Sequence, residues 1–497
     1  MPLRLRNLTI WNTGEQVDLV VDGPAARGFA ADEGTIDLTG VTLAPAFGDP
    51  HVHFRDPGQR AKETMATGCA AAAAGGYGLV LVMPNTVPAM DGAKVDPAEP
   101  GADEVTGAGC DNVIDYLQRY GEIHGVDLPV RYDLCVAAST DRAGGTASRY
   151  DDWAPYLRGV ADRNPQATRA MREHPVTAFS DDGSAVPDGI LDQVLANAKR
   201  AGVPFIDHCE HHDSGVMNEC ETARELGLPG IPEGTELAIV ARDIDRAAKA
   251  GVHLHLQHLS TAVAVDAVRR AKAAGLDVTC ETAPHYLALD DTAIATKGTL
   301  AKMNPPLRGK ADRDAVRAAV ADGTIDMLAT DHAPHTMEEK ARGMMDAPNG
   351  IIGLDCAYAV ARTTLVEGGV IDDRRLIELM AVNPYRFMGH EPADVAALAH
   401  TPGDGTAGAR KVIDLTGGNA PDADLVLLDT HARWTVDATR FASKARNTPY
   451  DGMEVVGRPL MTIVASRAVH ADADAIAAAA HAAEHPADVH RTAPETR

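Results

Sequence analysis

The 497-residue sequence predicts an α/β fold, in which a (β/α)8 barrel of the TIM type is joined to a small β-sandwich formed by both chain ends. Three observations predict it. Eight short apolar segments follow one another between residues 43 and 333, and helix-like stretches separate them. Further strand-like segments occur near both ends of the chain. The length exceeds that of one typical domain, which leaves room for a large barrel and a smaller unit.

The predicted domain boundaries follow from this alternation. Residues 1–42 contain three strand-like segments separated by Gly and Asp turns, and within residues 411–471 similar segments return at 423–429, 433–438 and 461–471. Both stretches are assigned to the small β domain, and residues 43–400 to the barrel. Residues 472–497 are rich in Ala, His, Asp and Pro with little pattern, so we expect a disordered tail there.

The barrel strands are predicted at the eight apolar segments. They are residues 43–53, 77–84, 129–138, 175–182, 202–209, 252–260, 277–285 and 325–333. Alternation of such strands with helices is typical of parallel sheets. A doubly wound open sheet is the alternative, and the count of eight favours the barrel.

Three of the stretches between the strands show clear helix signals. Residues 62–76 are rich in Ala and end in two glycines, which favour a helix stop. Residues 235–251 and 261–275 repeat apolar residues at helical spacing. Thr261 is a candidate N-cap for the second of these helices.

Composition limits the classes of function. The formal net charge is −25, which argues against a nucleic-acid or anionic-membrane partner. An anionic substrate would therefore need a local basic pocket. No apolar run reaches about 18 residues, so no membrane span is expected. Seven scattered cysteines without a CxxC pair predict reduced thiols and a cytoplasmic protein.

The segment GDPHVHFRDPG, residues 48–58, directly follows an apolar run. In a β-strand the side chains of His51, His53 and Arg55 would point to the same face, because successive side chains alternate. Two imidazoles on one face can hold a metal ion, and a guanidinium group beside them can hold an anion. The segment therefore predicts a metal site next to an anion site.

Metal-ligand residues recur at the ends of other predicted strands. The fourth ends in FSDDG (179–183), the fifth in His208, the sixth in His258 and the eighth in Asp331. A lone strand-end histidine is more often structural, but the carboxyl ends of barrel strands meet on one face, where active sites form. Nitrogen and carboxylate ligands without thiolate suit Zn²⁺, one or two ions per subunit, with Mn²⁺ or Co²⁺ as alternatives.

Short sequence motifs of a known enzyme family surround these residues. They are DPHVHFRDPG, MPNT, FSDDG, DHCE, TAPHYL, KMNPPLR, ATDHAPH and SKARNTPYDG, in this order along residues 43–470. In these motifs the chain resembles the amidohydrolase superfamily and, within it, the bacterial class I dihydroorotase family. The resemblance implies a zinc-dependent cyclic amide hydrolase that reversibly closes N-carbamoyl-L-aspartate to L-dihydroorotate in pyrimidine biosynthesis.

The resemblance also implies a set of metal ligands. His51, His53 and Asp331 would hold one metal, His208 and His258 a second, and Asp182 would bridge them, with Asp181 as the alternative. Many relatives bridge with a carboxylated lysine. This chain has no lysine between Lys94 and Lys199, so an aspartate bridge follows from the sequence itself.

The remaining site residues are implied by the same resemblance. Asp331 would be the general base, and the substrate contacts would be Arg55, Asn85, Asn304 and His335. The loop 347–355 aligns with a backbone segment that contacts the pyrimidine ring. It has Asn349 where a Phe is usual in the family.

The sequence also leads to expectations about partners and about alternative functions. The resemblance implies a homo-oligomer and association with an aspartate transcarbamoylase. The alternatives are another cyclic amidohydrolase, such as allantoinase or a dihydropyrimidinase/hydantoinase, and a non-catalytic scaffold of the same fold. The former typically carry the strand-4 lysine that is missing here. Residues 91–128 form a long acidic stretch to which the sequence assigns no role.

Overall fold

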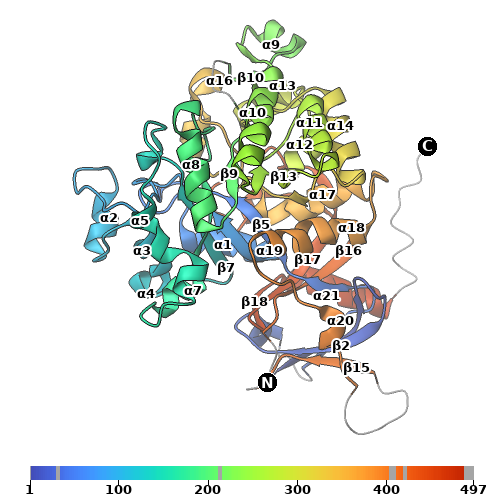
Figure 1. Cartoon of the computed structure of the whole chain (residues 1–497). Helices are drawn as coiled ribbons and strands as arrows, with labels where there is room; N and C mark the ends of the chain where they lie inside the picture. The colour runs from blue at the N-terminus through green and yellow to red at the C-terminus, as the bar shows by residue number, and fades with distance from the viewer. Residues whose placement is uncertain (1, 30–33, 211–214, 402–409, 418–421, 486–497) are drawn as a thin grey trace.

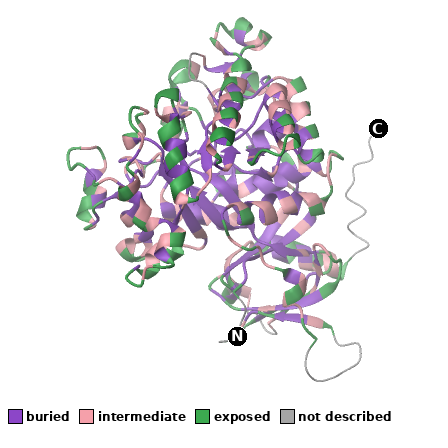
Figure 2. Ribbon diagram, viewed as in Figure 1, coloured by how far each residue is buried: buried purple, intermediate pink, exposed green. Residues whose placement is uncertain are grey.

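The computed structural model describes residues 2–29, 34–210, 215–401, 410–417 and 422–485. Figure 1 shows an upper body, in which helices surround a central set of strands, and a lower sheet that holds strands from both ends of the chain. Figure 2 shows that the strands of the upper body are buried and that exposed residues lie mostly on the outer helices.

The eight central strands form one parallel sheet in chain order. They are β5 (Phe47–Val52), β6 (Tyr77–Val82), β7 (Arg131–Ala137), β8 (Val176–Ser180), β9 (Phe205–Asp207), β12 (Leu254–Leu256), β13 (Val278–Thr282) and β14 (Met327–Leu328). The first and last strands meet beyond their ends, where the backbone N–H of His53 donates to the carbonyl of His332 at 2.9 Å. The predicted barrel is therefore confirmed over the open sheet.

The three helices predicted at residues 62–76, 235–251 and 261–275 lie between barrel strands, close to their expected bounds. The longer helices of the barrel are α1 (Met65–Ala74), α8 (Asp188–Ala201), α10 (Gly234–Ala250), α11 (Ala262–Ala273), α14 (Lys310–Ala321) and α17 (Ala357–Leu365). The predicted ones are α1, α10 and α11, and α17 follows the last strand. The Thr261 side chain accepts from the backbone N–H of Ala264 and caps α11, as predicted. Gly251 ends α10 with a φ of 65°, a conformation that glycine adopts without strain.

The lower sheet is mixed and contains strands from both ends, as predicted. Its strands are β1 (Leu3–Ile10), β2 (Gln16–Val21), β3 (Thr35–Asp37), β4 (Thr42–Pro45), β15 (Lys411–Asp414), β16 (Leu425–Thr435), β17 (Glu454–Val464) and β18 (Arg467–Ala471). Its central order is β15-β2-β1-β4-β16-β17-β18. Residues that are almost 400 apart in sequence pair directly, since Leu43 lies opposite Leu427.

Two predicted strands are each divided in the structure. The segment 43–53 belongs to both sheets, because β4 ends at Pro45 and β5 begins at Phe47. The segment 461–471 is a hairpin that turns at Ala465 and Ser466, whose φ angles are 50° and 62°. The sequence carries neither Gly nor Pro at this turn, so the apolar pattern alone indicated one strand.

The expectation of a disordered tail is wrong for its first part. Helix α21 covers Ala473–Glu484, and the Asp472 side chain caps it by accepting from the backbone N–H of Ala475 at 3.1 Å. Ile476 is buried in the core of the lower sheet. Alanine has the highest helix propensity, so the Ala-rich composition of this segment could have predicted the helix. Residues 486–497 lie outside the described part.

All seven cysteines are free thiols, and six of them are buried. Within the described ranges, no helix combines the length and the apolar character needed to cross a bilayer.

Candidate metal centre

The structure brings the predicted ligands together at the carboxyl ends of the barrel strands. The His53 Nε2 atom lies 3.1 Å from both Asp182 Oδ2 and Asp331 Oδ1. The His51 Nε2 atom lies 3.3 Å from Asp182 Oδ1 and 3.5 Å from Asp331 Oδ1. Two imidazoles therefore face two carboxylates that come from the ends of two other strands.

The second pair of histidines lies on the other side of Asp182. His208 Nδ1 is 3.4 Å from Asp182 Oδ1, and His258 Nε2 is 3.9 Å from the same oxygen. The two ring nitrogens are only 2.8 Å apart. Asp182 thus lies between both pairs of imidazoles, which is the position that a bridging ligand needs.

The donor set fits divalent metal ions. His51, His53 and Asp331 form one group whose ligand atoms all lie within 4.8 Å of one another, and His51, Asp182 and His258 form another. Asp182 Oδ1 is buried and has no hydrogen-bond partner among the described residues, so the protein alone leaves it unsatisfied. Imidazole and carboxylate donors without thiolate suit Zn²⁺, Mn²⁺ or Co²⁺.

The electrostatics of the cluster favour the charged carboxylate. Burial would raise the pKa of Asp182, but the facing imidazoles of His51 and His53 hold it well below its usual value. Burial likewise acts to lower the pKa of His51, while Asp182 and Asp331 raise it well above its usual value. An ionised Asp182 is the form that can bind a cation.

The choice between Asp181 and Asp182 depends on the turn after β8. The Asp181 carboxylate accepts hydrogen bonds from the backbone N–H and the hydroxyl of Ser139, so it faces away from the histidines. Asp182 faces all four of them. Of the two adjacent aspartates, only Asp182 is placed to contact a metal in this cluster.

Two cluster residues have left-handed backbone conformations. The φ angle is 38° at His258 and 47° at Asp331, although neither residue is glycine. Such angles cost free energy and persist where the surroundings enforce them, often at functional sites. At both positions the chain turns sharply at the point where the side chain reaches the cluster.

Polar partners orient the histidines. His51 Nδ1 donates to Glu281 Oε1 at 2.7 Å, and His53 Nδ1 donates to Asn85 Oδ1 at 2.7 Å. Both bonds leave Nε2 available for a metal, as is typical of ligating histidines. Sequence reasoning missed Glu281. An acidic residue at the end of the buried segment VTCET was the signal that could have found it.

Arg55 reaches the site by a different route from the predicted one. The expectation of a continuous strand face is wrong, because β5 ends at Val52 and Arg55 has a φ of 60°. Its side chain is nevertheless buried, and its Nε atom has no hydrogen-bond partner among the described residues. Burial lowers its pKa to about 10, so the group stays charged at neutral pH.

The stretch 91–128 supports the Arg55 turn. It contains α2 (Ala102–Gly107), α3 (Val113–Gln118) and α4 (Tyr120–His124). The hydroxyls of Tyr116 and Tyr120 donate to the Asp56 carboxylate at 3.1 and 2.9 Å. Asp56 is fully buried and adjacent to Arg55, so this stretch fixes the turn that carries the arginine.

The other predicted substrate contacts also lie at this end of the barrel. Asn304 Nδ2 is 3.2 Å from His208 Nε2. His335 Nε2 donates to the carbonyl of Asn349 at 2.8 Å, which leaves Nδ1 as an acceptor. Burial, with Arg55 nearby, lowers the pKa of His335 to about 2, so the ring is neutral.

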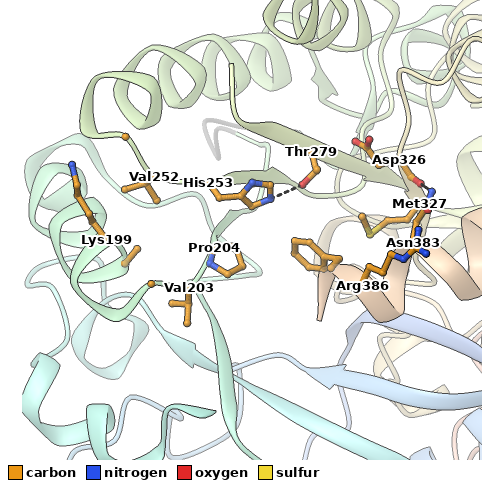
Figure 3. A pocket seen from close by; sticks show the side chains of 14 residues that line it. Lys199, Val203, Pro204, Val252, His253, Thr279, Asp326, Met327, Asn383 and Arg386 are labelled. Carbon is orange, nitrogen blue, oxygen red and sulfur yellow. Dashed lines mark hydrogen bonds between the residues drawn. The ribbon is translucent and has the colours of Figure 1, made fainter. Parts of the chain in front are cut away.

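A cavity of about 650 Å³ lies elsewhere in the barrel. Figure 3 shows it beside Val203 and Pro204, which precede β9, and beside Val252 and His253, which precede β12. It is therefore at the amino ends of the strands. None of the predicted site residues lines it, and barrel chemistry belongs at the opposite end.

Known proteins of similar sequence include an enzyme family and several dihydroorotases. The model of the amidohydrolase family matches residues 42–393. A protein named dihydroorotase from Pelotomaculum thermopropionicum is 36% identical over 461 residues, which cover 91% of this chain and 93% of that protein. A dihydroorotase from Anaeromyxobacter dehalogenans is 38% identical over 445 residues, covering 88% of each chain.

Solved structures of similar fold are named dihydropyrimidinase or hydantoinase, unlike the dihydroorotases found by sequence. The dihydropyrimidinase from Brevibacillus agri superposes with a TM-score of 0.68 at 21% identity and covers 94% of this chain and 95% of its own. The D-hydantoinase from Thermus sp. gives a TM-score of 0.65 at 23% identity, with the same coverage. At these identities the likeness concerns the fold.

Proposed function

This chain belongs to the amidohydrolase family, and from that premise we propose that it is a dihydroorotase, which interconverts N-carbamoyl-L-aspartate and L-dihydroorotate in pyrimidine biosynthesis. The observation that carries the proposal is Arg55. It is a buried guanidinium group beside the metal cluster, it stays charged, and its Nε atom has no partner among the described residues. A substrate carboxylate would supply that partner.

The same observation separates the alternatives. Dihydrouracil and hydantoins are cyclic amides without a carboxylate, so they would leave Arg55 buried and unpaired. An unpaired buried charge costs several kcal/mol, which would weaken their binding. The absent strand-4 lysine agrees with this preference. A non-catalytic scaffold is disfavoured because every predicted ligand is present and lies close to Asp182 or to another ligand.

We further propose how the metals are held. His51, His53 and Asp331 would hold one Zn²⁺, His208 and His258 a second, and Asp182 would contact both. When bound, such a pair of cations lowers the pKa of a water molecule and polarises a carbonyl group. The protein supplies the orientation, since Glu281 and Asn85 fix the rings of His51 and His53.

The side chains around the cluster would then perform the remaining steps. Arg55 holds the substrate carboxylate with its planar fork. Asp331 accepts a proton from the attacking water, whose oxygen bonds to the ring carbonyl carbon. As the carbon–nitrogen bond breaks, Asp331 passes that proton to the leaving ring nitrogen. In the reverse direction the same atoms close the ring and release water.

His335 is suited to accept a hydrogen bond from the substrate and not to bind its carboxylate. Its ring is neutral, and its Nε2–H already donates to the Asn349 carbonyl. The remaining Nδ1 atom is an acceptor. We propose that it accepts from an N–H of the substrate ring.

A substrate comparison tests the proposed function. We expect the purified, zinc-loaded chain to hydrolyse dihydroorotate and to form it from carbamoyl aspartate. Dihydrouracil is the matched control, because it is dihydroorotate without the carboxylate, and it should react far more slowly. Hydantoin and allantoin extend the comparison. Faster turnover of any of these three would replace the proposal with the corresponding neighbouring activity.

Arg55→Ala should weaken substrate binding and leave the metals bound. A charge-assisted bidentate contact contributes about 1.5–3 kcal/mol, so kcat/KM on dihydroorotate should fall roughly 10- to 150-fold. The loss should appear largely in KM if the contact is equally strong in the ground and transition states. Arg55→Lys should recover part of it, because a point charge cannot reproduce the fork. Unchanged kinetics, or loss of metal, would make Arg55 structural.

His51→Ala and His208→Ala should each lose bound metal and activity while remaining folded. Each ring supplies a nitrogen that faces Asp182, and alanine cannot ligate. Metal content by elemental analysis, with circular dichroism as the folding control, measures the effect. His253→Ala is a matched variant at the opposite end of the barrel and should keep its metal. Full metal and turnover in His51→Ala would refute the ligand assignment.

Resemblance and similarity to curated dihydroorotases support three further proposals. We propose a homo-oligomer that associates with an aspartate transcarbamoylase, and co-purification or a shift in sedimentation with that enzyme tests this. We also propose a cytoplasmic location, to which the seven free thiols are suited.

A further inference from the structure

The loop that follows β7 makes four hydrogen bonds to the turn that carries Asp181 and Asp182. This β7 loop comprises residues 139–144, and the aspartate turn comprises Asp181, Asp182 and Gly183. Ser139 binds the Asp181 carboxylate. The Nη2 atom of Arg142 donates to the carbonyl oxygens of both Asp181 and Asp182, at 3.3 and 2.5 Å. One side chain therefore holds two consecutive carbonyl groups.

Gly183 makes room for this guanidinium group. Its φ angle is 92°, and a Cβ atom built on it would lie 2.9 Å from Arg142 Nη2. Any other residue at this position would be strained and would push the arginine away. The glycine of FSDDG is therefore accounted for by the close approach of Arg142.

The β7 loop itself is held in an unusual conformation. Asp141 and Arg142 both have a φ of 54°, although neither is glycine. The backbone N–H of Asp141 donates to Asp91 Oδ2 at 2.9 Å, and the N–H of Gly144 donates to Ser139 Oγ at 2.9 Å. The surrounding bonds thus enforce a strained backbone that aims Arg142 at the aspartate turn.

We propose that Arg142 is a positioning residue that sets which of the two aspartates bridges the metals. Its bonds to both carbonyls fix the turn so that Asp181 points to Ser139 and Asp182 points to the four histidines. Without them the turn can rotate, and Asp182 loses its fixed place between the two histidine pairs. The inference rests on the proposed metal site.

The two metals should respond differently to the loss of Arg142. The first has three further ligands in His51, His53 and Asp331, whereas the second has only His208 and His258 besides the bridge. Residues that orient a ligand typically change metal affinity by 10- to 100-fold. The second metal should therefore be lost first.

The test is metal binding by Arg142→Met, which keeps the length and apolar stem of the side chain but removes its donors. Zn²⁺ content after dialysis and chelator competition gives stoichiometry and affinity, independently of activity. We expect two ions in the wild type and, in the variant, a second ion bound 10- to 100-fold more weakly. Arg142→Lys should restore part of the affinity, because its ammonium group can donate to both carbonyls.

Arg149→Met is the matched control, since Arg149 is an exposed arginine that follows the same strand. It should bind two ions as the wild type does. Thermal unfolding of all variants separates weaker metal binding from loss of the fold. If Arg142→Met does not fold, the comparison of Arg142→Lys with the wild type decides in its place.

The outcomes separate this inference from the proposed function. Two ions bound by Arg142→Met with wild-type affinity would overturn the inference and leave the metal site intact. A wild-type chain that binds no metal would instead refute the proposed metal site, on which the inference rests.

Discussion

Asparagine in place of Asp331 is expected to lower kcat by about 10²- to 10⁴-fold, which is the usual contribution of a general acid–base group. Asparagine keeps an oxygen that can contact the metal, but it cannot accept and return a proton. The side chain of Asp331 lies 3.1 Å from His53 Nε2, within the cluster where the reacting atoms would lie. Steady-state kinetics in both directions, together with metal content, measure the effect.

Asp326→Asn is the matched control for this prediction. Asp326 lies at the other end of the same strand, where its carboxylate accepts from Lys272 Nζ at 2.5 Å and from the backbone N–H of Cys280 at 2.8 Å. It should retain full turnover. If Asp331→Asn kept both its metal and the wild-type rate, Asp331 would have no part in proton transfer.

Alanine substitutions of the two adjacent aspartates should have different consequences. Asp182→Ala should remove bound metal and reduce activity by more than about 100-fold, because loss of a ligand exceeds the effect of losing the residue that orients it. Asp181→Ala should keep the metal but lower the free energy of unfolding by about 1–3 kcal/mol, since the buried N–H and O–H donors of Ser139 lose the carboxylate that accepts from them.

Metal analysis and urea denaturation of both variants test this contrast. Bicarbonate is the chemical control, because it restores enzymes that need a carboxylated lysine and should not restore this one after metal depletion. The reverse order of damage would move the bridge to Asp181. A carboxylated lysine in an experimental density map would end the aspartate-bridge hypothesis.

These contrasts show how far a strand-end pattern can be interpreted from sequence. The barrel was predictable because each buried strand is a short apolar run, and the length of such a run also marks where the strand ends. His51 is the last but one residue of β5, and His208, His258 and Asp331 follow shortly after β9, β12 and β14, so the sequence placed all four at one face of the barrel. Both features are local in the chain.

The direction of a side chain beyond a strand end is not local. Asp181 is turned away from the metal cluster by Ser139, 42 residues earlier, and His51 is oriented by Glu281, 230 residues later. Arg55 leaves the strand face because its backbone turns over Asp56, which the distant tyrosines Tyr116 and Tyr120 hold.

The sequence by itself determined the barrel, the β unit formed by both ends, and the residue types gathered for the site. Only the tertiary structure decided that Asp182 faces the histidines, that residues 91–128 support Arg55, and that Arg142 holds the aspartate turn. The physical reason is that hydrophobic patterning acts over a few neighbouring residues, whereas the rotation of a turn is decided by hydrogen bonds from segments that meet only after the barrel has closed.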